Sequence, residues 1–168
     1  MAFDAYLKLD GIQGEATDAN HTNEIQLLSF SFGGKQTSSI GSHSGGSGAG
    51  KVELANFSIT KYVDKASTPL FKSLVTGGHI KTGVFSGVKS GADGKPYLKL
   101  SFEELFVTSI HVSTTSEATA SEAKREIPTE SVSFSYSTIK YEYSTQDASG
   151  NQQATGSGKY DLAKNQYS

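Results

Sequence analysis

Apolar and polar side chains alternate along much of this chain, which is the pattern of β-strands that bury one face. In Ala2–Leu9 every second residue from Phe3 onward is apolar, and Ser131–Tyr143 alternates serines with larger apolar residues. The pattern predicts eight or nine strands in total. The other predicted strands are Ile25–Phe32, Val52–Val63, His79–Val88, Tyr97–Phe102, Leu105–Val112 and, more weakly, Gly158–Leu162.

Three of these strands have a predicted orientation or phase that the structure can test. Around residue 30, Leu28, Phe30 and Phe32 are expected in the core. Ser29 and Ser31 are then expected on the opposite face, because successive strand side chains point to opposite sides. The strand that begins at Val52 slips its phase once near Asn56, as a bulge would cause. In the strand that begins at Leu105, the residues expected to share one face are Phe106, Ile110 and Val112.

One segment, Asp64–Gly78, has a helical pattern instead. Ser67 or Thr68 can cap it, and Pro69 falls in the first turn, where proline is tolerated. Gly77 can end the helix in a left-handed conformation. The helix is short, so it is expected to pack its apolar stripe on the sheet. The residues of that stripe are Leu70, Phe71, Leu74 and Val75.

Between two predicted strands, Gly33–Gly50 shows no periodicity and is expected to be a long glycine-rich loop. Within it, Gly45, Gly50 and Lys51 satisfy the G-x-x-x-x-G-K spacing of a phosphate-binding loop. The required context is missing, because Val52 replaces the magnesium-binding Ser or Thr and a strand pattern follows where a helix is needed. The remaining interpretations are a flexible loop and a connector between subunits. The candidate connector residues are Ser42, His43, Gly45, Gly46, Gly48, Gly50 and Lys51.

Composition supports a mainly β protein, either a β-barrel or a sandwich with one short helix. The chain has 168 residues, which favours one domain over 1–168, and its 18 glycines and 35% hydrophobic content fit strands with polar faces better than a helical bundle. A net charge of −2 does not suggest nucleic acid as a partner. There is no N-terminal signal pattern and no apolar run that could span a membrane, so we expect a cytosolic protein or one exported without such a signal.

The search for chemistry gives no catalytic, cofactor or metal site. The chain lacks cysteine, and its histidines are scattered without H-x-H or H-x-x-x-H spacing. The pattern S-x-x-K occurs four times, which in a chain rich in Ser and Lys indicates chance. Glu103 and Glu104 are adjacent, so on a strand they cannot act as a catalytic pair. We therefore expect no enzyme.

The order of several segments resembles the haemolysin-coregulated proteins (Hcp), the tube subunits of type VI secretion systems. The segments are DGIQGEATDANH, LSFSFG, GAGKV, FSITKYVDKASTPLF and TESVSFSYSTIKYEY, and the resemblance covers essentially the whole chain. It implies hexameric rings that stack into a tube, with a spike, a sheath and a baseplate as partners and effectors as cargo. It also implies a cytoplasmic protein that the machine itself secretes.

The resemblance gives the candidate residues a role. Ser29 and Ser31 lie in LSFSFG, which corresponds to an inner-wall strand of the family, so they are candidate contacts to effectors in the lumen. The glycine-rich loop corresponds to a contact between subunits. Two alternatives remain open: a tail-tube protein of a phage or related contractile particle, and a small-molecule or glycan-binding β-barrel.

Overall fold

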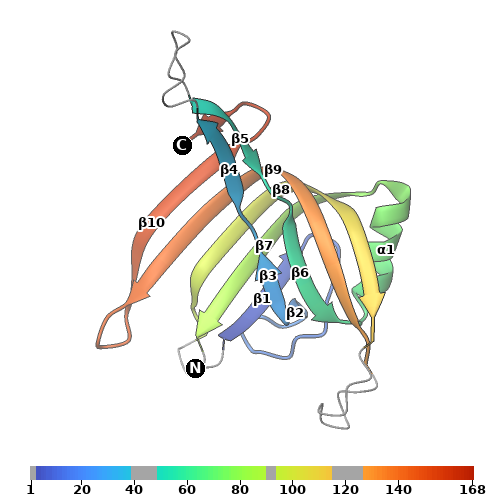
Figure 1. The fold of residues 1–168 in the computed structure, drawn as a ribbon. Coiled ribbons are helices and arrows are strands. Elements are labelled where there is room, and N and C mark those ends of the chain that lie inside the picture. The colour runs from blue at the N-terminus through green and yellow to red at the C-terminus, as the bar shows by residue number, and fades with distance from the viewer. Residues whose placement is uncertain (1–2, 39–48, 90–93, 115–126) are drawn as a thin grey trace.

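The structure is a computed structural model that describes residues 3–38, 49–89, 94–114 and 127–168. It is mainly β with one helix in this part of the chain, as the sequence predicts (Figure 1). The elements are β1 (Phe3–Leu9), β2 (Ile25–Leu27), β3 (Ser29–Ser31), β4 (Gly34–Ser38), β5 (Ala49–Leu54), β6 (Phe57–Tyr62), α1 (Ser67–Thr76), β7 (His79–Lys89), β8 (Pro96–Ser113), β9 (Thr129–Gln146), β10 (Gln152–Asp161) and β11 (Gln166–Tyr167).

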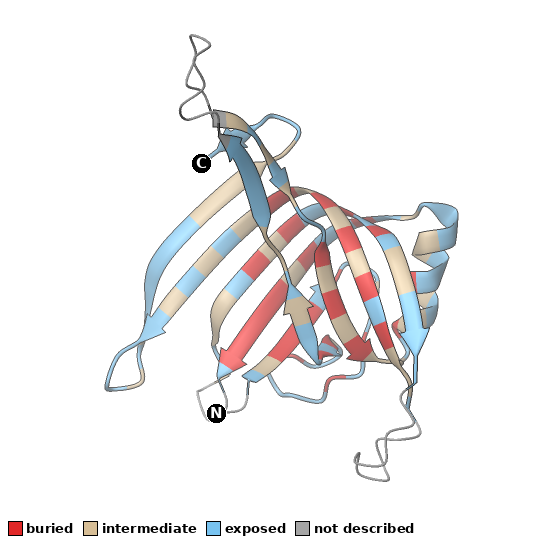
Figure 2. Cartoon of the chain, viewed as in Figure 1, coloured by how far each residue is buried: buried red, intermediate tan, exposed pale blue. Residues whose placement is uncertain are grey.

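Nine strands form one antiparallel sheet around the long strand β9. The main path is β11-β10-β9-β8-β7-β1-β2, and β6 joins the first part of β9 and carries β3 on its other side. Thus β9 pairs with β6 through Thr129–Phe134 and with β10 through Thr138–Gln146, while β8 runs along its opposite edge. The buried residues gather on β1 and on β6 to β9, whereas β10 and the described side chains of β4 include no buried residue (Figure 2).

The sheet is not closed as a barrel, which corrects the barrel form of the predicted fold. β2 pairs with β1 at one end of the sheet, and β3 pairs with β6 at the other. Leu28 alone separates the two strands, and its N–H donates to the carbonyl of Thr60 on β6. The two ends of the sheet are therefore linked through the chain, without a continuous ladder of hydrogen bonds.

This break also changes the expected core. Leu28 is 48% exposed, so its predicted burial is wrong, while Leu27 is buried in its place. The alternation restarts after the break: Phe30 and Phe32 are half-buried and pack against the core, as predicted. Two short strands with separate partners have replaced the single predicted strand.

The segment expected to be a structureless loop contains β4 and the first two residues of β5. β4 and β5 form an antiparallel two-stranded hairpin arm that is a sheet separate from the main one (Figure 1). The expected bulge near Asn56 is instead the boundary at which the chain leaves β5 and enters β6. Glycine-rich and polar strands without a buried face lack the alternation that identifies a strand, so the sequence pattern did not reveal β4.

Along β8 the predicted alternation of inward and outward side chains is correct through Phe102 and wrong at the residues that follow. Leu105 and Val107 are buried, whereas Phe106 is 42% exposed. Glu104 has a φ of 57°, the left-handed region, and this residue interrupts the alternation so that the inward face changes by one position.

Helix α1 ends as predicted but packs on a narrower face. Gly77 adopts the left-handed conformation at its end, and its N–H donates to the carbonyl of Ser73. Ala66, not Ser67 or Thr68, holds the N-cap position and has no side-chain cap. Of the predicted stripe, Leu70 is buried and Leu74 packs partly against the core. The other two members, Phe71 and Val75, are exposed, because a ten-residue helix at the border of the sheet presents only one side to it.

Candidate functional site

The sequence-predicted cargo residues lie on β3, and both are exposed. Ser29 is opposite Thr60 of β6, and Ser31 is opposite Ser58. Phe30, between them, turns inward and packs on Phe85, with ring centroids 4.2 Å apart. The expected opposition of serines and phenylalanine along this strand is therefore confirmed from Ser29 onward.

The strand register extends these two serines into a larger polar surface. From Ser31 the cross-strand partners run through β6 and β9 to β8, and a parallel row starts at Ser29. We call these two rows the hydroxyl face. The first row is Ser31, Ser58, Ser133 and Ser109, and the second is Ser29, Thr60, Ser131 and His111.

Chemically, the hydroxyl face offers hydrogen bonds without formal charge. None of its eight residues is Asp, Glu, Lys or Arg. Ser58 Oγ and Ser133 Oγ are 2.8 Å apart, so neighbouring strands already share a hydrogen bond across this face. A hydroxyl can donate and accept, so such a surface can bind polar groups of either kind.

The hairpin arm holds the two described residues of the predicted subunit-contact loop. Gly50 and Lys51 lie on β5, and Lys51 is exposed. A Cβ at residue 50 would lie 2.9 Å from the carbonyl oxygen of Thr37, so the close approach of the two arm strands requires glycine there. The other predicted loop residues, Ser42, His43, Gly45, Gly46 and Gly48, lie outside the described residues.

An open apolar groove of about 500 Å³ lies between the arm and the outer strands of the sheet. Val52 and Leu54 of β5 form one side, and Tyr141 and Tyr160 stand on the other. Phe32 lines the groove too, and its ring centroid is 5.7 Å from that of Tyr141. The arm and the sheet therefore present one continuous apolar surface, which sequence periodicity alone did not indicate.

At the base of the arm a buried tyrosine fixes the boundary between β5 and β6. The hydroxyl of Tyr136 donates to the carbonyl oxygen of Ala55 at 3.0 Å. Burial raises the pKa of Tyr136, so the group stays protonated and keeps this donor. The point from which the arm leaves the sheet is therefore anchored.

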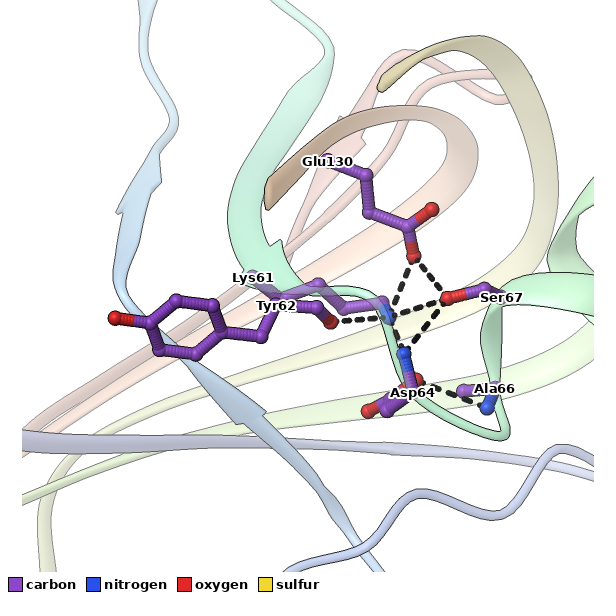
Figure 3. A network of polar contacts seen from close by, with 6 residues as sticks. All are labelled: Lys61, Tyr62, Asp64, Ala66, Ser67 and Glu130. Atoms are coloured by element: carbon purple, nitrogen blue, oxygen red, sulfur yellow. Dashed lines mark hydrogen bonds and ion pairs between the residues drawn. The ribbon is translucent and has the colours of Figure 1, made fainter. Parts of the chain in front are cut away.

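A buried polar network joins β6, β9 and the start of α1 (Figure 3). Lys61 Nζ is 2.5 Å from Glu130 Oε1 and 2.6 Å from Asp64 Oδ1. Ser67 Oγ lies 2.7 Å from Glu130 Oε1, and the N–H of Ala66 donates to Asp64 Oδ1 at 2.9 Å. Each charged group has several partners, so the network positions the helix on the sheet and leaves no open place for a substrate.

The sequence contains a feature that predicts this network but was not used above: charged residues at inward positions of two strands. In the alternation of β6, Lys61 occupies the same face as the buried Phe57 and Ile59, and Glu130 shares the inward face of β9 with Val132. Two opposite charges at inward positions of two strands predict a buried pair, because an unpaired buried charge is too costly. What the sequence does not reveal is that β6 and β9 are neighbours.

In the described part of the chain, the other histidine and glutamate side chains discussed above make contacts that support the fold. His21 is buried, stacks on Tyr6 with centroids 4.4 Å apart and places Nδ1 2.9 Å from Glu24 Oε2. Among the described residues no three His, Asp or Glu side chains are grouped so as to hold a metal ion. Glu104 pairs with His79 on the exposed surface. No described helix has the length and apolar character needed to cross a membrane.

Comparison with known proteins connects this arrangement to a family. Residues 6–143 match the family described as "Type VI secretion system effector, Hcp". Protein hcp1 of Pseudomonas aeruginosa is 30% identical over 151 residues, which cover 89% of this chain and 88% of that protein.

Solved structures agree over the whole fold. A structure described as a type six secretion system protein has a TM-score of 0.89 at 28% identity and covers 99% of this chain and 100% of its own. Hcp1 from Salmonella typhimurium has a TM-score of 0.77 at 32% identity, with 100% of both chains covered. The chain thus belongs to the Hcp family of type VI secretion, the structural subunits of the secretion tube.

Proposed function

We propose that this chain acts as one tube domain over 1–168, forms six-membered rings and stacks them into a tube that carries effectors. The observation that carries the proposal is a pair of strand edges that pair with no further strand among the described residues. β3 pairs only with β6, and in the described chain β8 pairs with β9 alone after Phe106, the last β8 residue opposite β7. These edges end the row β3-β6-β9-β8 on its two sides.

Two different edges on one subunit suit a closed ring. In a head-to-tail ring each copy contributes two unlike patches, and an open edge offers free N–H and C=O groups to a neighbour. The hydroxyl face runs from one open edge to the other, through Ser31 and Ser109. Pairing of successive copies at these edges would continue its rows around the ring and line the bore with Ser29, Ser31 and their row partners.

The arm has a second role in this proposal. It pairs with no strand of the main sheet and exposes Lys51 and the apolar groove beside it. A two-stranded arm gains little from its own packing, so contacts with other copies would stabilise it. We assign the arm to contacts between subunits and between stacked rings, as the glycine-rich loop suggested.

The wider assembly follows from the family. The tube would be enclosed by a contractile sheath, mounted on a baseplate and tipped by a spike protein. Effectors would occupy its lumen, and the chain would pass from the cytoplasm to the outside when the machine fires. No nucleic acid, membrane insertion or cofactor is part of this proposal.

Imaging of the purified chain tests the ring. Native mass spectrometry should give a mass of six subunits, and negative-stain images should show rings with an open centre. Monomers at micromolar concentration in both measurements would overturn the proposal.

A further inference from the structure

The apolar groove lies at the β3 end of the row β3-β6-β9-β8, on the side opposite the hydroxyl face. Phe32, the residue after β3, lines the groove and packs against the core. Tyr141 and Tyr143 of β9 line it as well, and they remain 45% and 39% exposed. The fold therefore leaves apolar surface uncovered at this end of the row.

The helix α1 presents a second exposed apolar surface at the β8 end of the row. Phe71 is 58% exposed and Val75 is 61% exposed, and residues four apart lie side by side on a helix. Leu70 of the same helix is fully buried in the core, so α1 also lies on the side opposite the hydroxyl face. Figure 1 shows α1 and β10, which borders the groove, on opposite sides of the subunit.

Helix α1 runs beside the stretch of β8 that has no partner in β7. It packs against β8, and its first residue contacts Glu130, which lies opposite Val112. After the helix, the chain enters β7 opposite Phe106. The last turn of α1, which holds Val75, therefore lies toward the Phe106 end of this stretch.

Joining the two strand edges of successive copies brings the two apolar surfaces together. Neighbours in the row β3-β6-β9-β8 are all antiparallel, so β3 and β8 run in opposite directions and can pair as antiparallel strands between copies. When the hydroxyl faces continue on one side of this joint, α1 of one copy and the groove of the next lie on the other side. From Ser31 the chain continues through Phe32 into the groove, which is the direction from Ser109 toward Phe106 on the adjoining β8.

The two surfaces also match in chemistry. Among the described residues that line the groove, Lys159 is the only charged one, and it pairs with Glu103. An uncharged apolar insert suits such a lining, because its burial removes apolar surface from water on both sides. Phe and Val are poorer helix formers than Glu or Lys, so a helix side meant only for water would be more stable with charged residues. A contact that covers Phe71 and Val75 accounts for their presence.

We propose that Phe71 and Val75 of one subunit pack into the apolar groove of the next subunit in the ring. The inference rests on the proposed ring and names the side chains that join successive subunits beside the paired strand edges. The groove is then a composite site, with its walls from one copy and its occupant from another. Ring closure covers the exposed apolar surface at both ends of every subunit.

Cysteine cross-linking tests this contact directly, because the chain has no cysteine of its own. The variant V75C/V52C places one thiol on α1 and one in the groove, and both substitutions preserve side-chain size closely. The control V75C/K99C moves the second thiol to an exposed position of β8 between Leu98 and Leu100, where the side chain points to the other face of the strand. V75C alone tests for contact between two helices. Purified rings are treated with a short bismaleimide and separated on denaturing gels.

A second measurement follows ring stability without cross-linking. F71S/V75S is compared with F71L/V75I, which keeps the surface apolar. Circular dichroism checks that both variants fold, as expected for two exposed positions. Native mass spectrometry over a dilution series gives the concentration at which rings dissociate into subunits.

The expected result is a ladder of covalent species up to six subunits for V75C/V52C and none for V75C/K99C or V75C. Rings of F71S/V75S should dissociate at a concentration at least tenfold higher than those of wild type and of F71L/V75I. Intact rings without the V75C/V52C ladder, or wild-type stability of F71S/V75S rings, would overturn the contact and leave the ring standing. Covalent dimers of V75C alone would also overturn it, since two helices would then meet. A monomeric wild-type chain would refute the ring itself, and this inference with it.

Discussion

Lys61 and Glu130 lie directly opposite each other on β6 and β9, and both are buried with 2.5 Å between Nζ and Oε1. Removal of one partner leaves the other charge buried and unpaired, which typically costs about 3–5 kcal/mol. We therefore expect Lys61→Met to lower the free energy of unfolding by about that amount, measured by urea denaturation. Lys35→Met is the control, because Lys35 and Glu53 form an exposed pair worth about 0–1 kcal/mol. A similar small loss for both variants would show that the buried network does not hold the helix.

The two sides of α1 should differ in their effect on stability. Leu70→Ala should cost about 2–5 kcal/mol, because Leu70 is fully buried. Val75→Ala should change the free energy of unfolding by less than about 0.5 kcal/mol, because its side chain is exposed. Thermal or urea unfolding of the two variants checks this, and equal losses would contradict the packing of α1.

Shortening the arm should affect assembly more than folding. Replacement of Ser42–Gly48 by a two-residue turn should leave the β-rich circular dichroism spectrum unchanged, because the main sheet pairs independently of β4 and β5. Stacking of rings, measured by sedimentation velocity, should weaken. An unfolded variant would show instead that the segment belongs to the folding core.

Ser31→Gln tests the cargo role of the hydroxyl face. Ser31 is exposed at the end of a cross-strand row, so a longer polar side chain there should leave rings and melting temperature little changed. An effector that co-purifies with wild type should be lost or depleted. Ser149→Gln, in the exposed turn between β9 and β10, is the control and should retain the effector. Retention by both variants would place Ser31 away from the cargo.

The same turn supplies a prediction of pH dependence. Backbone N–H groups of Asn151 and Ser149 donate to Asp147 Oδ1 at 2.8 and 2.9 Å, and these bonds hold the pKa of Asp147 below its ordinary value of 3.8. The ionised carboxylate thus stabilises the fold at pH values above the ordinary pKa. This contribution is lost as the pH falls through the lower pKa of the folded state. Carbon-detected NMR titration should show the depressed pKa, and an ordinary value would contradict these bonds.

The sequence predicted local elements well where one side of the element is buried. Alternation identified β9 and its inward Val132 and Phe134, and the glycine at position 77 identified the end of α1. It failed where burial does not follow a simple period. Leu28 lies between two strands and Glu104 has a left-handed backbone conformation, and each interrupts the alternation. Neither leucine nor glutamate is a residue type from which such an interruption can be predicted.

The candidate surfaces depended on strand order, which no local pattern contains. Ser58 and Ser133 each stand out as polar positions between apolar neighbours. Only the pairing of β6 with β9 joins them with Ser31 into one row. In the same way, Lys61 and Glu130 become a pair only through that register.

The uncharged rows of the hydroxyl face bear on how anything could travel across them. A polypeptide that lies on this surface exchanges hydrogen bonds with water for hydrogen bonds with Ser and Thr, and each exchange changes the free energy by only about 1 kcal/mol. No ion pair has to be broken to advance by one row. Such a surface offers many weak hydrogen bonds with small energy barriers between them. A polypeptide in the proposed lumen could therefore be bound while the tube is at rest and still slide along it and be released.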